Sequence, residues 1–129
     1  YNYLNYIHTA SLDDTGRLNV GASIGIKNET ENLERIDKLV EAGVNLICID
    51  VANGFNVNVK NLIIKIRDLY PHLVIMAGNV CNYEGYKYLN EVDVDCIRVG
   101  IGSGSSCTTR SKTGIGFGQW SSVNECFDY

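Results

Sequence analysis

The part of the sequence with the clearest chemical potential runs from Arg98 to Arg110 and reads RVGIGSGSSCTTR. Glycine stands at every second position from Gly100 to Gly104, which lets the backbone adopt positive φ and lets a ligand approach the peptide groups. Hydroxyl side chains then surround one cysteine, Cys107. A cysteine thiolate is a strong nucleophile, so the pattern favours a reactive thiol on a ligand-binding loop. A flexible turn that carries an incidental thiol is the alternative that the spacing leaves open.

The remaining residues predict alternating strands and helices that would position this loop. Apolar runs predict four strands, at 18–24, 44–49, 73–77 and 96–99. Helical spacing of apolar residues predicts helices after Asn28, over 59–69, from Asn82 and from 121 onward. Asn28 and Glu31 have the spacing of a capping box. Strand and helix recur about every 25 residues, the length of a βα unit, which predicts an α/β fold with a parallel sheet.

Three residues able to do chemistry lie just past the ends of predicted strands: Asp50, Asn79 and Cys107. Loops that follow parallel strands converge at one edge of the sheet, so a shared site is expected there. The segment 78–80 is expected to turn away from the third strand. Asp and Asn are also ordinary turn formers, which is the structural alternative for each of them taken alone.

Composition and charge exclude several classes of function. The 129 residues are 45% hydrophobic and 20% charged with a formal net charge of −4, which is typical of a globular domain and leaves no basic surface for nucleic acid or anionic lipid. No apolar run approaches the roughly 20 residues that a membrane span needs, and residues 1–9 have no signal-peptide pattern. We therefore expect a cytoplasmic protein without a nucleic-acid or membrane partner.

The five cysteines show no pattern of pairing. Their number is odd and none has CxxC spacing, which argues against a disulfide framework and a zinc site. Cys48 and Cys96 lie within apolar runs and are expected to be buried. Only Cys107 stands in a loop suited to close approach.

Residues Gly100 to Arg110 resemble the catalytic-cysteine loop of the IMP dehydrogenase and GMP reductase family, whose members are (β/α)₈ barrels that act on purine nucleotides. Residues 13–25, 50–54 and 77–80 are similar to other stretches of that family in order and spacing. The resemblance implies parallel (β/α) units of a TIM-type (β/α)₈ barrel, with only about half of the barrel present. We therefore expect a lead-in segment at 1–17 and a partial barrel domain over 18–129. Uncovered sheet edges predict a homo-oligomer.

Two motifs bear on the branch of the family. DVANGF at 50–55 and KTGIGF at 112–117 followed by Gln119 are similar to GMP reductases, whereas 13–25 is closer to bacterial dehydrogenases. We therefore expect a GMP reductase-like enzyme, which converts GMP to IMP with NADPH through a covalent intermediate on Cys107. One alternative is an IMP dehydrogenase, which converts IMP to XMP with NAD. The other is a non-catalytic fragment or degenerate paralogue that binds a nucleotide or a partner subunit.

The resemblance also implies roles for individual residues. The catalytic residues would be Cys107, which attacks C2 of the purine, and Thr109, which assists proton transfer. The substrate-binding residues would be Ser105, Gly104, Asn79 and Arg98. The cofactor-binding residues would be Asp50, Ala52, Asn53 and Gly54. A potassium ion would bind the backbone carbonyls of Gly102, Gly104 and Cys107.

Other readings of the glycine-rich loop are less favourable. The order G-x-G-x-G lacks the third glycine that a dinucleotide-binding G-x-G-x-x-G needs, and no lysine follows as in a P-loop. Within the resemblance, Ser103 and Gly118 stand where proline is common. Glycine at 118 is expected to loosen the loop because it has more unfolded conformations to lose.

Overall fold

The computed structural model describes residues 10–127 and confirms the predicted α/β architecture. Its strands are β1 (Gly21–Ile24), β2 (Leu46–Asp50), β3 (Val74–Val80) and β4 (Cys96–Val99). Its helices are α2 (Glu29–Glu41), α3 (Val57–Leu69), α4 (Tyr83–Asn90), α5 (Thr109–Thr113) and α6 (Gln119–Phe127). Within the described range, no helix is long and apolar enough to cross a bilayer.

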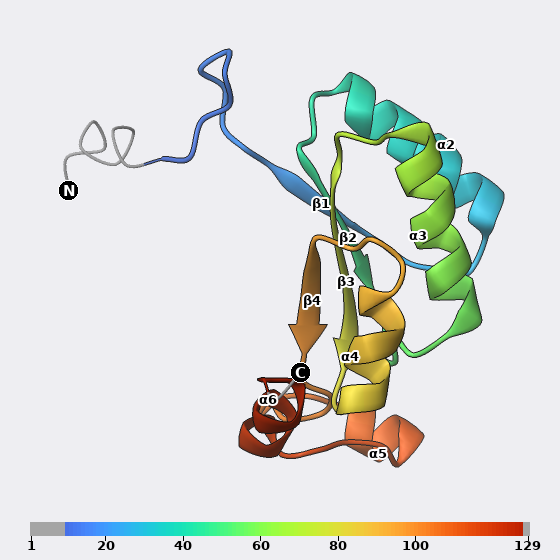
Figure 1. Cartoon of the computed structure of the whole chain (residues 1–129), viewed down its shortest axis with the longest axis vertical. Coiled ribbons are helices and arrows are strands. Elements are labelled where there is room, and N and C mark those ends of the chain that lie inside the picture. The colour runs from blue at the N-terminus through green and yellow to red at the C-terminus, as the bar shows by residue number, and fades with distance from the viewer. Residues whose placement is uncertain (1–9, 128–129) are drawn as a thin grey trace.

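The four strands form a parallel sheet whose spatial order, β1-β2-β3-β4, is the order of the chain. Helices α2, α3 and α4 cover one side of it, and α5 and α6 lie beyond the carboxyl ends of the strands (Figure 1). Consecutive units of a (β/α) barrel have this arrangement, so the structure agrees with the predicted partial barrel.

Each of the three helices packed on the sheet begins at an asparagine: Asn28, Asn56 and Asn82. The side-chain oxygen of each accepts a hydrogen bond from a backbone N–H two or three residues further on. Such caps contribute about 1 kcal/mol each, because they satisfy donors that the first helical turn leaves unpaired. The cap predicted at Asn28 is confirmed, although Glu31 accepts from the Asn28 side-chain amide rather than from its backbone.

The hydrophobic core lies between the sheet and these helices. Alternate residues of β2 and β3 point into it and are fully buried: Ile47, Ile49, Ile75 and Ala77. They meet the buried faces of the helices, formed by Ile36, Val59, Leu62, Ile63, Ile66 and Leu89. Burying one such Ile or Leu side chain contributes about 1.5–3 kcal/mol, so this layer holds the sheet in place.

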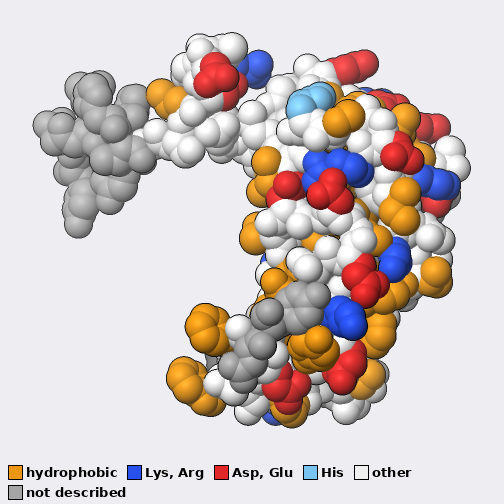
Figure 2. Space-filling view, in the orientation of Figure 1, with side chains coloured by type: hydrophobic (Ala, Val, Ile, Leu, Met, Phe, Trp, Pro, Cys, Tyr) orange, Lys and Arg blue, Asp and Glu red, His pale blue; other side chains and the backbone are white. Residues whose placement is uncertain are grey.

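The opposite face of the sheet carries smaller and more polar residues. Ser23, Cys48, Met76 and Cys96 are register partners across the four strands on that face. Cys48 is buried as predicted, but Cys96 is exposed because β4 forms an edge of the sheet. Figure 2 shows the outline of the molecule hollowed on this side.

Two strand boundaries differ from the sequence-based prediction by three residues, and the others by two or fewer. The strand expected at 18–24 begins only at Gly21, because Leu18 pairs with Leu12 in an antiparallel bridge. This bridge crosses the boundary predicted between 17 and 18, and residues 1–9 of the lead-in segment lie outside the described residues. The turn expected at 78–80 is instead the end of β3, because β2 and β4 both pair with this segment.

The amino ends of the strands are tied together by Arg67, near the end of α3. Its guanidinium donates to the carbonyl oxygens of Leu73 at 3.0 Å and Asp93 at 2.9 Å, and to Asp95 Oδ2 at 2.6 Å. The same Asp95 oxygen accepts the Ile75 N–H at 2.7 Å. One arginine therefore joins α3 to the start of β3 and to the loop before β4.

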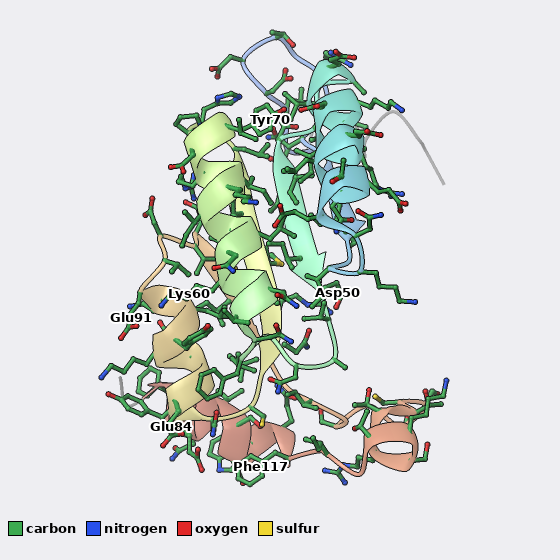
Figure 3. All side chains as sticks on the ribbon, turned by 90° about the vertical axis from the view of Figure 1, so that its right-hand side faces the viewer. Asp50, Lys60, Tyr70, Glu84, Glu91 and Phe117 are labelled. Carbon is green, nitrogen blue, oxygen red and sulfur yellow. The ribbon has the colours of Figure 1, made fainter. Side chains whose placement is uncertain are left out.

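Helices α3 and α4 are also linked on their outer surface, where Figure 3 labels Lys60 and Glu91. Lys60 Nζ lies 3.7 Å from Glu91 Oε2 and 4.6 Å from the centroid of the Tyr88 ring. The Tyr88 ring packs against Phe55, with 4.8 Å between centroids. These contacts attach the loop after β2 to α4, and so fix the position of that loop at the carboxyl ends of the strands.

Candidate active site

A cavity of about 400 Å³ opens at the carboxyl ends of β2, β3 and β4. Figure 3 shows Asp50 at the end of β2, on the side of the molecule where the chain leads into α5 and α6. The residues that line the cavity come from three loops: Asp50, Val51, Ala52, Asn79, Arg98, Gly100, Ile101, Gly102, Cys107 and Thr109. The convergence of Asp50, Asn79 and Cys107 that their positions predicted is therefore confirmed.

An ion pair crosses the floor of this cavity between two strands that are not neighbours. Arg98 Nη1 of β4 lies 2.9 Å from Asp50 Oδ2 of β2 and donates to Cys48 Sγ at 3.6 Å. The hydrogen bond to Asp50 raises the pKa of Arg98 above its ordinary value. Both side chains are partly open to solvent, 39% for Arg98 and 45% for Asp50, so the pair faces the cavity rather than the core.

Gly78 makes this contact across β3 possible. It is the register partner of both Asp50 and Arg98. A Cβ atom at this position would lie 2.7 Å from Arg98 Cβ and 2.8 Å from the Arg98 carbonyl oxygen. Only glycine leaves room for the arginine to pass over β3, because real Cβ atoms do not approach other heavy atoms so closely.

Asn79 joins two of the loops that line the cavity. Its side-chain Nδ2 donates to the carbonyl oxygen of Gly100 at 2.8 Å. Its own carbonyl accepts the Gly54 N–H at 2.7 Å, and its N–H donates to the carbonyl of Val51 at 3.0 Å. The residue therefore holds the loop after β2 and the cysteine loop against the end of β3.

Cys107 is exposed, and its surroundings favour the thiolate. Its Sγ lies 3.3 Å from Thr109 Oγ1, a hydroxyl that donates to the sulfur once the thiol is ionised. This contact lowers the pKa of Cys107, with further contributions from the backbone N–H groups of Thr109 and Gly102 and from the positive charge of Arg110. These groups outweigh the small effect of burial, so the thiolate is more populated near neutral pH than in an ordinary cysteine.

Several residues predicted for the site do not line the cavity. Asn53 instead closes a turn, because its Oδ1 accepts the Phe55 N–H at 3.0 Å. Gly54 is buried behind the cavity, against Gly78 and Asn79. Gly104 and Ser105 lie on the exposed tip of the cysteine loop, where the Gly104 carbonyl accepts the Cys107 N–H at 3.1 Å.

Other residues of the site were not predicted. Val51, Gly100 and Ile101 line the cavity, and Cys48 supports Arg98 from beneath. The alternation of side chains along a strand could have identified Cys48, because it stands two residues before Asp50 and shares its face of the sheet. Within residues 10–127, no group of three or more His, Cys, Asp or Glu side chains is placed to hold a metal ion.

Comparison with known proteins identifies the family of this chain. Residues 4–129 match the IMP dehydrogenase / GMP reductase domain. The chain is 45% identical over 117 residues to inosine-5'-monophosphate dehydrogenase of Bacillus subtilis (strain 168), covering 91% of this chain and 24% of the relative. It is 41% identical over 117 residues to that of Chlorobaculum parvum, covering 91% and 23%. It is 43% identical over 116 residues to that of Aquifex aeolicus, covering 90% and 23%.

The similarity extends through the cavity and the cysteine loop, although the chain spans only about a quarter of the length of these relatives. The matched domain covers nearly all of the sequence, and the parallel (β/α) units are those that a barrel of this kind requires. This chain belongs to the IMP dehydrogenase / GMP reductase family.

Proposed function

We propose that this chain carries the nucleophile and part of the nucleotide pocket of a purine-nucleotide oxidoreductase. The observation that carries the proposal is the placement of Cys107. An exposed cysteine with a lowered pKa lines a cavity of about 400 Å³ that the Arg98–Asp50 pair also lines. That volume is within the range of small-ligand sites and suits a purine base with a reacting partner more than two whole nucleotides.

In this proposal the Cys107 thiolate adds to C2 of the purine ring and forms a carbon–sulfur bond. Thr109 Oγ1, at 3.3 Å from the sulfur, stabilises the thiolate before the addition, and in the reductive reaction it can then donate its proton to the ammonia that leaves C2. Asn79 and Arg98 are proposed to bind the base, because their side chains supply hydrogen-bond donors in the same cavity. Gly104 and Ser105, at the open tip of the loop, are proposed to bind the nucleotide phosphate.

The first candidate reaction is the oxidation of IMP with NAD, which the names of the similar proteins favour. Addition of the thiolate to C2 of IMP allows hydride to leave C2, and water then displaces the cysteine and releases XMP. A nicotinamide cofactor supplies the hydride acceptor. Asp50 and Ala52 are proposed to hold its reactive ring, because they line the same cavity as Cys107.

The second candidate is the reductive deamination of GMP to IMP with NADPH, favoured by Asn53 and by the segment 112–119. Here ammonia leaves C2 after the thiolate adds, and hydride delivered to C2 then releases IMP and the thiolate. Asn53 shapes the loop that carries Ala52 through its hydrogen bond to Phe55, and Gly54 lets that loop pack on β3. These two residues would act on the cofactor through Ala52 rather than by direct contact.

A monovalent cation such as K⁺ is also part of the proposal. The backbone carbonyls of Gly102, Gly104 and Cys107 are oxygen donors, which hard cations prefer. The Gly104 carbonyl already accepts the Cys107 N–H but retains a second lone pair. We expect K⁺ to slow the alkylation of Cys107 relative to Li⁺ at equal ionic strength, because a bound cation would restrain the loop.

Self-association is proposed on the basis of the sheet edges. Within residues 10–127, β1 and β4 each have a strand neighbour on one side only, and exposed parallel edges favour association. Light scattering over a range of concentrations should therefore show oligomers. A monomer at every concentration tested would contradict this part of the proposal.

The test of the nucleotide site is protection of Cys107 from iodoacetamide, measured residue by residue by mass spectrometry. IMP or GMP at millimolar concentration should slow the labelling of Cys107 and leave the exposed Cys96 unaffected, and AMP serves as the control nucleotide. Absorbance assays with IMP and NAD, and with GMP and NADPH, then separate the two candidates. If neither IMP nor GMP protects Cys107 in a folded sample, a non-catalytic fragment is the better description.

A further inference from the structure

Two cysteines outside the candidate active site meet where α6 packs against the end of β3. Cys81 directly follows Val80, the last residue of β3, and is partly buried. Cys126 lies near the end of α6 and is buried. The Cys126 thiol donates to the carbonyl oxygen of Asn82, the residue after Cys81, at 3.7 Å. Two segments that are far apart in sequence therefore bring their thiols to one junction.

The packing of α6 and the cap of α4 hold this junction in place. Ser122 and Cys126 stand one turn apart and are both buried, so one face of α6 is turned toward the body of the chain. The helix contacts α4 and β4, and Figure 3 shows it beside the first turn of α4. Asn82, which accepts the Cys126 thiol, also caps α4, because its Oδ1 accepts the Gly85 N–H at 3.1 Å. The cap therefore fixes the backbone next to Cys81.

The environment of the two thiols disfavours their ionised forms. Burial raises the pKa of Cys81 and of Cys126, and the negative charge of Glu125 raises both further. Cys81 also contributes to the raised pKa of Cys126, which agrees with the proximity that the Asn82 contact indicates. Both thiols are therefore protonated at neutral pH, unlike an activated nucleophile. The neutral forms that suit this junction are two thiols or the disulfide that joins them.

We propose that Cys81 and Cys126 are a redox pair that forms a reversible disulfide between the end of β3 and α6 when the chain meets a small disulfide such as oxidised glutathione. The partly exposed Cys81 gives its proton to water, and its sulfur attacks the small disulfide and releases one thiolate. Cys126 then loses its proton, attacks the Cys81 sulfur of the mixed disulfide and releases the second thiolate. Two protein thiols are thereby oxidised, and one small disulfide is reduced to two thiols, which take up the two protons.

The bond would fasten a helix that contacts the cysteine loop at its other end. α6 begins at Gln119, whose Nε2 donates to the carbonyl of Val99 at 3.0 Å. The Oε1 of the same side chain accepts a hydrogen bond from Ser103 Oγ at 2.7 Å. A covalent link at Cys126 should therefore restrain the opening of the whole helix. The proposal goes beyond the proposed function, because it involves neither a nucleotide nor the chemistry of Cys107.

The test incubates the full chain with mixtures of oxidised and reduced glutathione, blocks free thiols and maps the peptides by mass spectrometry. Peptides linked through Cys81 and Cys126 should appear at a lower proportion of oxidised glutathione than the mixed disulfide at the exposed Cys96, because the second thiol is already held nearby. Cys126→Ser keeps the size of the side chain, and should leave glutathione on Cys81 and no linked peptide. If Cys126→Ser does not fold by circular dichroism, Cys81→Ser, at a partly exposed position, replaces it and should leave Cys126 free.

Hydrogen–deuterium exchange measures the consequence for α6. The amides of 119–127 should exchange about tenfold more slowly in the oxidised chain than in the reduced chain, and dithiothreitol should reverse the change. Cys81→Ser, treated in the same way, should show no slowing, which separates the bond from glutathione attached at Cys96 or Cys107. A folded chain in which no mixture links Cys81 to Cys126 overturns the proposal, and unchanged exchange in the linked chain overturns the fastening of α6. Neither result bears on the protection of Cys107 by IMP or GMP.

Discussion

An arginine and an aspartate meet at each end of the sheet, and the two pairs serve different purposes. At the amino end, Arg67 is 19% exposed and donates to three backbone carbonyls in addition to Asp95. At the carboxyl end, Arg98 is 39% exposed, and within residues 10–127 its hydrogen bonds run through Nη1 alone. The same type of ion pair therefore stabilises the fold at the amino end of the sheet. At the carboxyl end it leaves guanidinium donors of Arg98 facing the cavity.

The difference shows how burial and the number of acceptors determine what an ion pair does. Arg67 is surrounded by carbonyl groups that fix its planar donors, so removal of the side chain would leave several acceptors unpaired. Arg98 reaches its partner across a glycine and keeps part of its guanidinium in contact with solvent. Four variants test this contrast, in order of the effect expected.

The largest effect is expected for Arg67→Ala. It leaves the carbonyls of Pro71, Leu73 and Asp93 without the arginine and Asp95 with the Ile75 N–H as its remaining donor. The free energy of unfolding should fall by about 2–3 kcal/mol. Urea denaturation followed by circular dichroism measures the change. Arg35→Ala, on the exposed face of α2, is the control and should change stability by less than about 0.5 kcal/mol. If the two variants lowered the free energy of unfolding equally, Arg67 would stabilise the fold no more than an exposed arginine does.

Gly78→Ala should lower stability by about 1–3 kcal/mol, because the new methyl group would overlap the backbone and Cβ of Arg98. Gly25→Ala is the matched control, since a Cβ there meets no atom within 4 Å. The same urea titration compares the two. A neutral Gly78→Ala would mean that Arg98 can move away, and that its contact with Asp50 depends less on the glycine than the geometry indicates.

Asp95→Asn should lower the free energy of unfolding by about 1 kcal/mol at neutral pH. We expect no larger effect because the carboxylate is 46% exposed and water screens its charge. Partial burial raises the pKa of Asp95, but the Ile75 N–H and Arg67 outweigh it and hold the pKa below its ordinary value of 3.8. A carboxylate whose pKa is lowered on folding stabilises the fold at pH values above its unfolded-state pKa. That stabilisation is lost as the pH falls through its folded-state pKa.

The stability difference between the parent chain and Asp95→Asn should therefore be full at pH 7 and shrink below about pH 4. Urea titrations at several pH values measure it. Asp68→Asn, at an exposed position of α3, is the control. A difference that stays constant down to pH 3 would show that the Asp95 carboxylate does not titrate with the fold.

The smallest effect on stability is expected for Arg98→Ala, below about 1 kcal/mol, because the pair with Asp50 is solvent-exposed. Its effect on the cavity should be larger: the protection of Cys107 by IMP or GMP should be lost. Thermal unfolding and the alkylation assay report the two quantities on one sample. If Arg98→Ala destabilised the chain as much as Arg67→Ala, the two ends of the sheet would not differ in the way proposed.

Local patterns predicted most of the secondary structure, because their energetics depend on neighbours in sequence. Asn28 and Asn82 cap helices that begin where the polar-to-apolar change predicts them. The strand from 96 to 99 has the predicted limits. The prediction was wrong at 78–80 because Gly78 and Asn79 are common turn residues. Only the pairing of Gly78 with β2 and β4, and of Val80 with β4, keeps this segment in the sheet.

The residues of the candidate site could likewise be predicted only in part. Asp50, Asn79 and Cys107 were expected from their positions after predicted strands, and Arg98 and Thr109 from the family resemblance. All five line one cavity. The hydrogen bonds of Gln119 to Val99 and Ser103 could not be predicted, because they depend on how α6 meets a loop that begins 20 residues earlier. The exposure of Cys96 likewise depends on β4 being an edge of the sheet.

The amino-acid sequence by itself determined the parallel (β/α) repeat, two of the three asparagine caps that start its helices and a cysteine after a glycine-rich turn. Hydrophobic spacing and backbone conformational preferences act over a few residues, so these features can be read along the chain. The tertiary structure decided that Arg67 stabilises the fold and that Arg98 faces the cavity. It also brought Gln119 into contact with Val99 and Ser103. Those outcomes depend on strand register and on the contacts of residues far apart in sequence, which exist only once the sheet has formed.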